Sequence, residues 1–405
     1  MSEFEVKVVQ IEIEEHPNAD ALELAAIGGY RAIVKKDRFK TGDYVAYVPE
    51  GALMPEWLLK QEMFWDADKG KGILAGGRGD RVKPIKLRGI LSEGVTIRPH
   101  LVDANNPSRV LFGREKEAFL NDPEGFKAAI SESYDEECRM DHLEEMIWVN
   151  ADDDVTDFFG ITKWEPPIPV HMTGESQGAP KWTIKYDIEN IKKYNKVLEV
   201  GEDVAITEKL HGTFAQIGYV PEEDLIVISS KGLGAKGIIL KSNEANENNL
   251  YVRTANMVGD DGLSIIDKIK EFANVRGEPV YILGEIFGRG VQDLMYGQDT
   301  PVFRAFDMYV GKPQAGKYFN FDDMIKFCEY LNIETVPILY RGPYDHQMML
   351  DLTDGKETVS GKSNNIREGV VIKPTIEREC KWLSRIILKS VSVKYLTRKG
   401  GTELN

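Results

Sequence analysis

A lysine beside a glycine turn is the sharpest chemical feature of the sequence. Residues 207–213 read Thr-Glu-Lys-Leu-His-Gly-Thr, so Lys209 closes an apolar run and Gly212 follows three residues later. A lysine amine at the end of a strand can act as a nucleophile if burial or a nearby cation lowers its pKa from the usual ~10.4. Taken alone, this heptapeptide is more typical of a surface lysine whose stem covers apolar neighbours.

Four further segments carry charged or aromatic residues at the borders of apolar runs. Residues 281–288 and 367–374 each set one carboxylate, Glu285 or Glu368, beside a glycine. Residues 303–307 end in an aromatic residue and an acid, and residues 386–392 place Lys389 after an apolar run. Each segment also has an ordinary reading: an edge-strand charge, a core phenylalanine or a surface lysine.

The five segments, taken in this order, resemble the motifs of the covalent nucleotidyltransferase superfamily of polynucleotide ligases and mRNA capping enzymes. The Glu-Lys-x-His-Gly-Thr form is most similar to RNA ligases, including the phage enzyme that seals nicks in duplex RNA. The strand-rich beginning of the chain resembles the Deinococcus-type RNA ligases, which carry an N-terminal OB domain. The resemblance covers about residues 165–400 by motif order.

The resemblance implies an ATP-dependent RNA ligase that acts in RNA repair. Lys209 would attack the α-phosphate of ATP and hold AMP, which would pass to an RNA 5′-phosphate before a 3′-hydroxyl displaces it. Lys389 would contact the α-phosphate and assist the transfer. Glu285 and Glu368 would hold a divalent metal ion, Mg2+ or Mn2+, in part through its waters.

The resemblance also implies contacts to the nucleotide and shows two departures from the family pattern. Phe306 would stack on adenine, Glu208 would meet the base edge, and Lys231 would lie near the ribose and the RNA phosphate. His211 stands where many relatives have aspartate, and we expect it to contact a phosphate instead. The second lysine of the last motif is replaced by Val391, with Lys394 or Arg385 as candidate substitutes.

The remaining pattern predicts how these motifs are positioned. Residues 1–100 alternate short apolar runs with turn residues, which predicts a small OB-like β-barrel. Residues 101–163 are expected to form an acidic insertion or connector, because residues 101–165 hold 17 acidic and 6 basic side chains. Residues 164–405 mix strands with helices and predict an α+β nucleotidyltransferase domain built on antiparallel sheets.

The elements of the second domain are predicted from the period of their apolar residues. Helical spacing is expected around residues 188–194, 263–269 and 321–331. Strands are expected at residues 204–208, 215–219, 225–229, 280–285, 302–306, 369–373 and 385–389.

The composition of the chain limits the classes of protein to which it can belong. The chain has 405 residues, a net charge of −15 and three scattered cysteines, which disfavours a disulfide framework and a thiolate zinc site. No apolar run approaches the ~18–20 residues of a membrane helix, and the first residues lack the apolar stretch of a secretory signal. We expect a soluble, cytoplasmic monomer that works on RNA and ATP and has no membrane partner.

Alternative functions stay open from sequence alone. A DNA ligase or a capping guanylyltransferase is disfavoured because we find no C-terminal OB domain with the motif those enzymes use. A nucleic-acid-binding relative without catalysis would be consistent with Val391 and His211, but the nucleophile and both acids are present. Basic residues cluster within residues 78–88, where they could follow a phosphate backbone or form a solvated edge strand.

Overall fold

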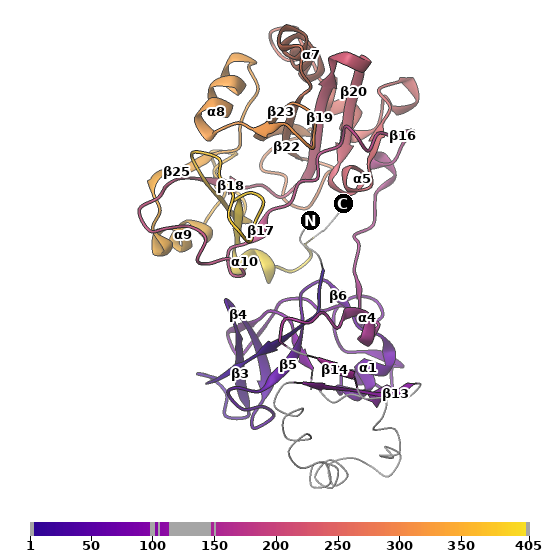
Figure 1. Ribbon diagram of the computed structural model, residues 1–405, viewed down its shortest axis with the longest axis vertical. Helices are drawn as coiled ribbons and strands as arrows, with labels where there is room; N and C mark the ends of the chain where they lie inside the picture. Colours follow the sequence, from indigo (N-terminus) through magenta and orange to yellow (C-terminus); the bar gives the residue numbers. More distant parts are fainter. Residues whose placement is uncertain (1–3, 98–101, 104–105, 113–146, 150, 402–405) are drawn as a thin grey trace. The chain divides into compact units, whose positions relative to one another are not determined.

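The chain divides into two compact units between Glu165 and Pro166 (Figure 1). The computed structural model describes residues 4–97, 102–103, 106–112, 147–149 and 151–401. Most of the predicted acidic insertion lies outside these residues, so its boundaries stay a prediction. None of the described helices combines the length and apolar character that crossing a membrane requires.

The N-terminal unit is built mainly from short antiparallel strands. One sheet has the order β1-β5-β11 and another the order β2-β3-β4. The strands of these sheets are β1 (Lys7–Gln10), β2 (Glu12–Glu15), β3 (Leu22–Ile27), β4 (Tyr30–Lys35), β5 (Tyr44–Val48) and β11 (Val95–Ile97). A third sheet has the order β12-β13-β14, formed by β12 (Val102–Asp103), β13 (Asn106–Phe112) and β14 (Ile147–Val149). Two-stranded pairings involve β6 (Ala52–Leu53), β7 (Trp65–Asp66), β8 (Lys71–Gly72), β9 (Ile85–Leu87), β10 (Ile90–Ser92) and β15 (Thr162–Lys163).

The core of this unit combines alternate strand residues with two short helices. Val8 and Val48 are fully buried and pack with Leu58 of α1 (Glu56–Gln61). Phe159 of α4 (Thr156–Phe159) belongs to the same cluster. Residues 155–161, which the sequence placed in the connector, therefore contribute to the core of the N-terminal unit.

The C-terminal unit contains two antiparallel sheets, as the sequence predicts. The larger sheet has the order β16-β21-β20-β19-β22-β23-β24 and the smaller one the order β17-β27-β26-β18-β25. The larger sheet comprises β16 (Ser176–Gly178), β19 (Thr213–Val220), β20 (Leu225–Ser230), β21 (Ile238–Leu240), β22 (Val280–Phe287), β23 (Val302–Val310) and β24 (Lys317–Tyr318). The smaller comprises β17 (Glu189–Asn190), β18 (Asp203–Lys209), β25 (Ile338–Pro343), β26 (Gly369–Pro374) and β27 (Leu388–Val391), with β17 and β27 parallel.

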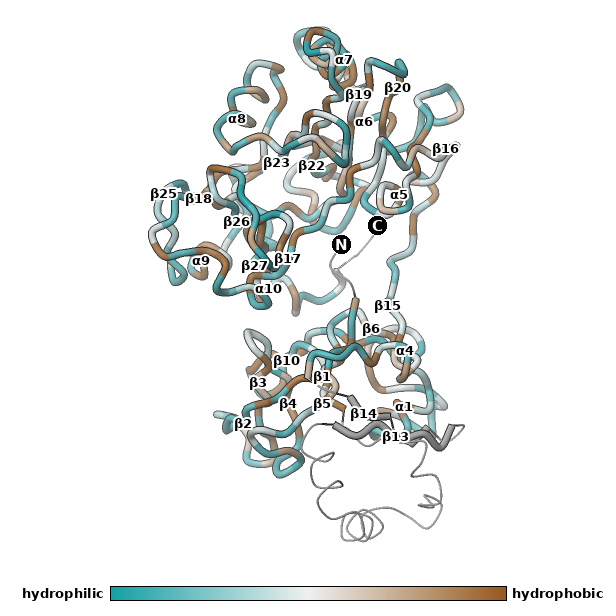
Figure 2. The backbone as a smooth tube through the Cα atoms, in the orientation of Figure 1, coloured by the Kyte–Doolittle hydropathy of each residue, from teal (hydrophilic) through white to brown (hydrophobic). Residues whose placement is uncertain are grey.

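Helices cover one face of the larger sheet and leave its other face to the smaller sheet. α6 (Leu250–Ala255), α7 (Ile265–Arg276) and α8 (Phe321–Tyr330) bury apolar side chains against the strands. α7 begins at a Ser264–Asp267 capping box and ends at Gly277, whose φ of 67° suits glycine. Figure 2 shows the apolar stretches that line these layers, for example along β19. The remaining helices are α5 (Lys231–Ala235), α9 (His346–Thr353) and α10 (Val393–Leu396).

The helix predicted around residues 188–194 is wrong. Glu189 and Asn190 form β17, which pairs with β27, and turns follow up to residue 200. The Asn190 side chain accepts a hydrogen bond from the Lys192 N–H at 3.0 Å, a local bond that competes with helix formation. Ile191 is buried in the core beside the smaller sheet. The helix-like spacing of apolar residues in this segment therefore comes from a turn that is buried, and not from a helix.

Candidate active site

Lys209 lies where β18 ends, and its side chain reaches an enclosed carboxylate. The Lys209 Nζ lies 2.6 Å from Glu368 Oε1. β18 pairs with β26 so that Lys209 faces Gly369, directly after Glu368. Two residues that are 159 positions apart therefore meet because their strands are neighbours.

A cavity of about 210 Å³ opens beside this lysine, between the two sheets of the C-terminal unit. The larger sheet and α5 contribute Phe214, Glu285, Phe306 and Lys231, and the smaller sheet contributes Glu208, Lys209, Val371, Lys373 and Lys389. The volume and the mixed apolar and charged lining suit a small organic anion. Six of the eight residues predicted for the site line this cavity.

The turn between Lys209 and β19 depends on a close approach of two backbones. A Cβ built on Gly212 would lie 2.1 Å from the carbonyl oxygen of Ile286 and 3.0 Å from the Glu285 Cγ. The glycine is thus required by contact with β22, whereas the sequence suggested a need for a sharp turn. This contact holds the Lys209 strand end next to Glu285.

Three ionisable groups of the cavity shift one another's protonation. Burial acts to lower the pKa of Lys209, but the carboxylates of Glu368 and Glu285 outweigh it, so the pKa is raised. Burial raises the pKa of Glu285 to about 8, and the charge of Glu368 acts in the same direction. Burial and the charge of Lys209 lower the pKa of Lys389 to about 8. Because its pKa is raised, the Lys209 amine is protonated as an ammonium at neutral pH.

The two carboxylates fit the role of cation ligands. Glu368 Oε2 is buried and has no hydrogen-bond partner among the described residues. An unsatisfied carboxylate oxygen near a second enclosed acid, whose pKa is raised, favours binding of a positive ion. Among the described residues, no three acidic, histidine or cysteine side chains are placed to hold a metal ion together, so protein ligands alone would leave coordination positions for water.

Glu208 is almost fully buried, with 1% exposure, and only one of its two carboxylate oxygens is satisfied. Its Oε2 accepts hydrogen bonds from the backbone N–H and the hydroxyl of Thr358, at 2.9 Å and 2.7 Å. Its Oε1 has no partner among the described residues. Glu208 thus lines the cavity and keeps one buried carboxylate oxygen without a donor among the described residues.

Aromatic rings form an apolar wall of the cavity. The rings of Tyr186 and Phe306 have centroids 5.4 Å apart, and Tyr186 and Phe214 stack at the same separation. All three residues line the cavity. A planar base can pack against such a wall.

His211 lies outside the cavity lining and belongs to a polar network with the C-terminal helix. Its Nε2 is 2.8 Å from Asp293 Oδ1 and its Nδ1 is 2.7 Å from the Tyr395 hydroxyl. Arg398 pairs with Asp293 at 3.0 Å, and burial lowers the pKa of His211. The neutral imidazole therefore ties α10 to the turn after Lys209, and its contact with a phosphate stays a prediction.

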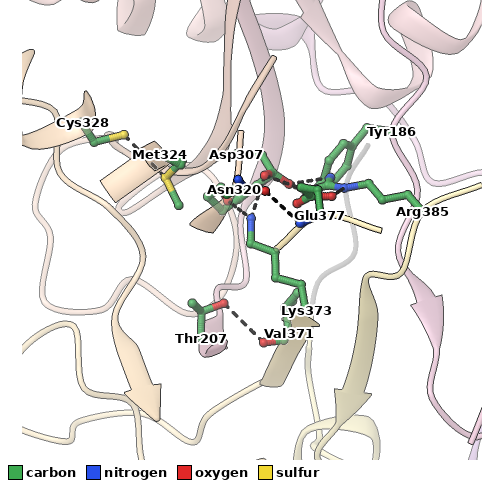
Figure 3. Close-up of polar contacts among 11 residues, drawn as sticks. Tyr186, Thr207, Asp307, Asn320, Met324, Cys328, Val371, Lys373, Glu377 and Arg385 are labelled. Atoms are coloured by element: carbon green, nitrogen blue, oxygen red, sulfur yellow. Dashed lines mark hydrogen bonds and ion pairs between the residues drawn. The ribbon is translucent and has the colours of Figure 1, made fainter. Parts of the chain in front are cut away.

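A second buried network engages Arg385, one of the candidate substitutes for the lysine that Val391 replaces. Arg385 contacts Asp307 through both terminal nitrogens, at 2.8 Å and 2.9 Å, and also pairs with Glu377 (Figure 3). Lys373 Nζ lies 2.7 Å from Asp307 Oδ1, an oxygen that Arg385 also contacts, and Lys373 lines the cavity. Lys394 is exposed on α10. Lys373 is thus the additional cation of the cavity.

Sequence reasoning missed Lys373, Tyr186, Phe214 and Thr358. Lys373 was within a recognised motif, and its position two residues after Val371 on β26 could have indicated the shared face. The aromatic residues carried no distinguishing signal. Thr358 lies 150 residues from Glu208, so only the fold brings them together.

Family models match both parts of the chain. Residues 202–391 match the model described as RNA ligase, and residues 6–99 match one described as an OB-fold domain. No curated protein matches the chain.

Solved structures of Naegleria gruberi RNA ligase share the fold at 22% sequence identity. A variant with ATP and Mn has a TM-score of 0.67 and covers 96% of this chain and 98% of its own. A variant with AMP and Mn has a TM-score of 0.68, and the enzyme with PPi one of 0.67; each covers 97% of this chain and 98% of its own. The predicted fold class is confirmed: an α+β unit built on antiparallel sheets follows a small β domain, and the two parts match the RNA ligase and OB-fold family models.

Proposed function

We propose that the protein is an ATP-dependent RNA ligase that joins a 3′-hydroxyl to a 5′-phosphate, at nicks, in RNA repair. The observation that carries the proposal is Lys209 at a cavity edge, between two carboxylates and next to the cations Lys389 and Lys373. The similar structures that contain ATP or AMP with Mn support a nucleotide and metal as ligands. The OB-fold match at residues 6–99 supports the Deinococcus-type arrangement.

Three displacements at phosphorus make up the reaction. The deprotonated Lys209 Nζ forms a P–N bond with the α-phosphate of ATP while the bond to pyrophosphate breaks. An oxygen of the RNA 5′-phosphate then takes the AMP and releases the lysine. The 3′-hydroxyl attacks that 5′-phosphate, loses its proton and releases AMP.

The residues of the cavity supply charge and position for these steps. Lys389 and Lys373 would neutralise phosphate oxygens, and Lys231, which pairs with Asp187 at 2.8 Å, would reach the ribose or the RNA. Phe306 would pack against adenine. His211 would approach a phosphate only if its network with Asp293 opens.

Glu285 and Glu368 are the residues that would hold a divalent cation, Mg2+ or Mn2+. When bound, the ion supplies positive charge that stabilises phosphate oxygens and lowers the pKa of Lys209. Glu368 would exchange its ion pair with the lysine for that contact. This exchange would free the amine as a nucleophile.

The decisive experiment is formation of a labelled protein adduct from [α-32P]ATP and Mg2+ or Mn2+. Wild-type protein and Lys236→Ala, which alters an exposed lysine, should retain label after denaturation, whereas Lys209→Ala should retain none. Equal labelling of Lys209→Ala would contradict the proposal. Ligation of matched RNA and DNA nicks, and labelling by GTP, then separates an RNA ligase from a DNA ligase or a capping enzyme.

The carboxylates have a separate prediction. Glu285→Ala and Glu368→Ala should each slow adduct formation at least ~100-fold, because loss of metal electrostatics costs several kcal/mol. Chelation by EDTA should abolish labelling of the wild type, and added Mn2+ should restore it. Unchanged rates in both variants would show that other groups hold the metal.

A further inference from the structure

We propose that Thr358 is a positioning residue that makes the cavity select adenine over guanine by fixing the Glu208 carboxylate. This inference rests on the proposed nucleotide site and adds a residue to it. Thr358 lies in the loop between α9 and β26, far along the chain from the lysine motif.

Thr358 occupies one side of the Glu208 carboxylate with two donors. Both its N–H and its hydroxyl donate to Oε2, and the Arg367 Nε lies 3.8 Å from the same oxygen. Oε1 is left without a hydrogen-bond partner among the described residues, although Glu208 lines the cavity. The rotation of the carboxylate is thus fixed, and its other oxygen is a buried acceptor that no described residue satisfies.

A single fixed acceptor discriminates between the two purines. Adenine carries an exocyclic amine at position 6, which can donate to Oε1, whereas guanine carries a carbonyl oxygen there. A carboxylate oxygen facing that carbonyl would repel it and remain unsatisfied. Sites that depend on a buried hydrogen bond reject the analogue that lacks it more strongly than apolar sites do.

The loop that carries Thr358 is organised by its own buried groups. Glu357 is fully buried and accepts hydrogen bonds from the backbone N–H groups of Ser360 and Asn364, at 2.8 Å and 2.9 Å. Arg367 donates to the carbonyl oxygens of Leu352 and Lys356, at 2.6 Å and 2.9 Å. The position of Thr358 is therefore set by contacts that do not involve Glu208.

Thr358 is an exposed residue, so we expect its substitution to leave the packed core unchanged. Replacing it by valine keeps its shape and removes one of the two donors to Glu208. Thr358→Ser keeps the hydroxyl and serves as the matched control. Thr358→Ala, which only removes atoms, repeats the test in case valine disturbs the loop.

The experiment measures binding of the α,β-methylene analogues of ATP and GTP to the full chain by calorimetry. These analogues cannot transfer a nucleotide, so the readout is affinity alone. We expect the wild type and Thr358→Ser to prefer the adenine analogue to a similar degree. Thr358→Val and Thr358→Ala should lose at least about tenfold of that preference, the effect of one hydrogen bond to a charged group.

Two results would overturn the inference: an unchanged preference in Thr358→Val and Thr358→Ala, or equal weakening of both analogues. The adduct assay separates this failure from failure of the proposed function. A wild type that forms the adduct with ATP while the variants keep its preference refutes the role of Thr358 only. A wild type that binds neither analogue refutes both.

Discussion

At the scale of residues, the site holds enclosed ionisable groups close enough to shift one another's pKa. Lys209 is stabilised as an ammonium by Glu368, and Glu285 carries a pKa of about 8 because it is enclosed near a second acid. The residue types were predicted from their motifs. Their protonation was not, because it depends on burial and on distances between strands.

The raised pKa of Glu285 predicts a stability that falls as pH rises. Between its unfolded pKa of ~4.3 and its folded pKa of about 8, the folded protein binds more protons than the unfolded chain. Stability should therefore decline across this window in EDTA, and Glu285→Gln should flatten the decline. The variant should exceed the wild type by roughly 1–3 kcal/mol at pH 8 in denaturant unfolding.

Glu278→Gln is the control, because this glutamate is 51% exposed in its pair with Arg276. Its stability curve should parallel that of the wild type. If the stability curve of Glu285→Gln also parallels that of the wild type, the pKa of Glu285 is not raised and its ionisation does not destabilise the folded protein.

At the scale of elements, apolar alternation was enough to place most strands, and spacing by three was not enough to place every helix. The predicted strands at residues 204–208, 215–219 and 280–285 lie within β18, β19 and β22. The turns after β17 were mistaken for a helix because their apolar residues, including the buried Ile191, follow one another at helical spacing. Contacts such as Thr358 with Glu208 depend on loop geometry, which local sequence patterns do not encode.

The close contact at Gly212 predicts a coupled loss of stability and activity. Gly212→Ala would push the Cβ against the Ile286 carbonyl and separate β19 from β22, at a cost of roughly 1–3 kcal/mol. Adduct formation should fall ~10-fold or more, since Lys209 and Glu285 flank this contact. Gly178→Ala, whose Cβ meets nothing within 4 Å, should leave both unchanged.

Asp307 joins the two sheets, and its loss should destabilise the unit that holds the cavity. The residue lies on β23, while its partners Lys373 and Arg385 belong to β26 and to the segment before β27. Asp307→Asn would leave buried cations without their counter-charge, at a cost of about 3 kcal/mol. The exposed Asp299, at 84%, provides the control Asp299→Asn, which should cost less than ~0.5 kcal/mol.

The pH dependence of this contribution has the opposite sign to that of Glu285. Burial opposes the ionisation of Asp307, but Arg385 and Lys373 outweigh it and lower the pKa to about 2. Its stabilisation is present above the unfolded pKa of ~3.9 and is lost as pH falls towards 2. Acid unfolding of Asp307→Asn should therefore be shallower than that of the wild type, and identical slopes would contradict the assignment.

At the scale of the whole molecule, a net charge of −15 coexists with local basic surfaces. In the N-terminal unit, the hairpin of β9 and β10 exposes Lys86 and Arg88 beside Ile85 and Leu87. Arg78 pairs with Asp80, and Arg81 is buried over the Trp164 ring. The basic cluster noted in the sequence is thus divided: Arg81 is buried, whereas Arg78 and the hairpin residues Lys86 and Arg88 are exposed to solvent.

Charge reversal at the hairpin tests whether this part contacts RNA. Lys86→Glu with Arg88→Glu should weaken RNA binding and reduce its salt dependence by about two contacts, measured by fluorescence anisotropy. Adduct formation with ATP should be unchanged, because the change lies in the other unit. Unaltered RNA affinity would indicate that these basic residues form a solvated edge strand that does not bind RNA.

The ion pair between Lys209 and Glu368 gives the resting protein chemical latency. An ammonium held at 2.6 Å from a carboxylate has no lone pair to offer, so acylating agents and aldehydes should find this amine inert until the pair is broken. Under the proposed function, a cation that binds Glu368 would break this ion pair and make the Lys209 amine reactive.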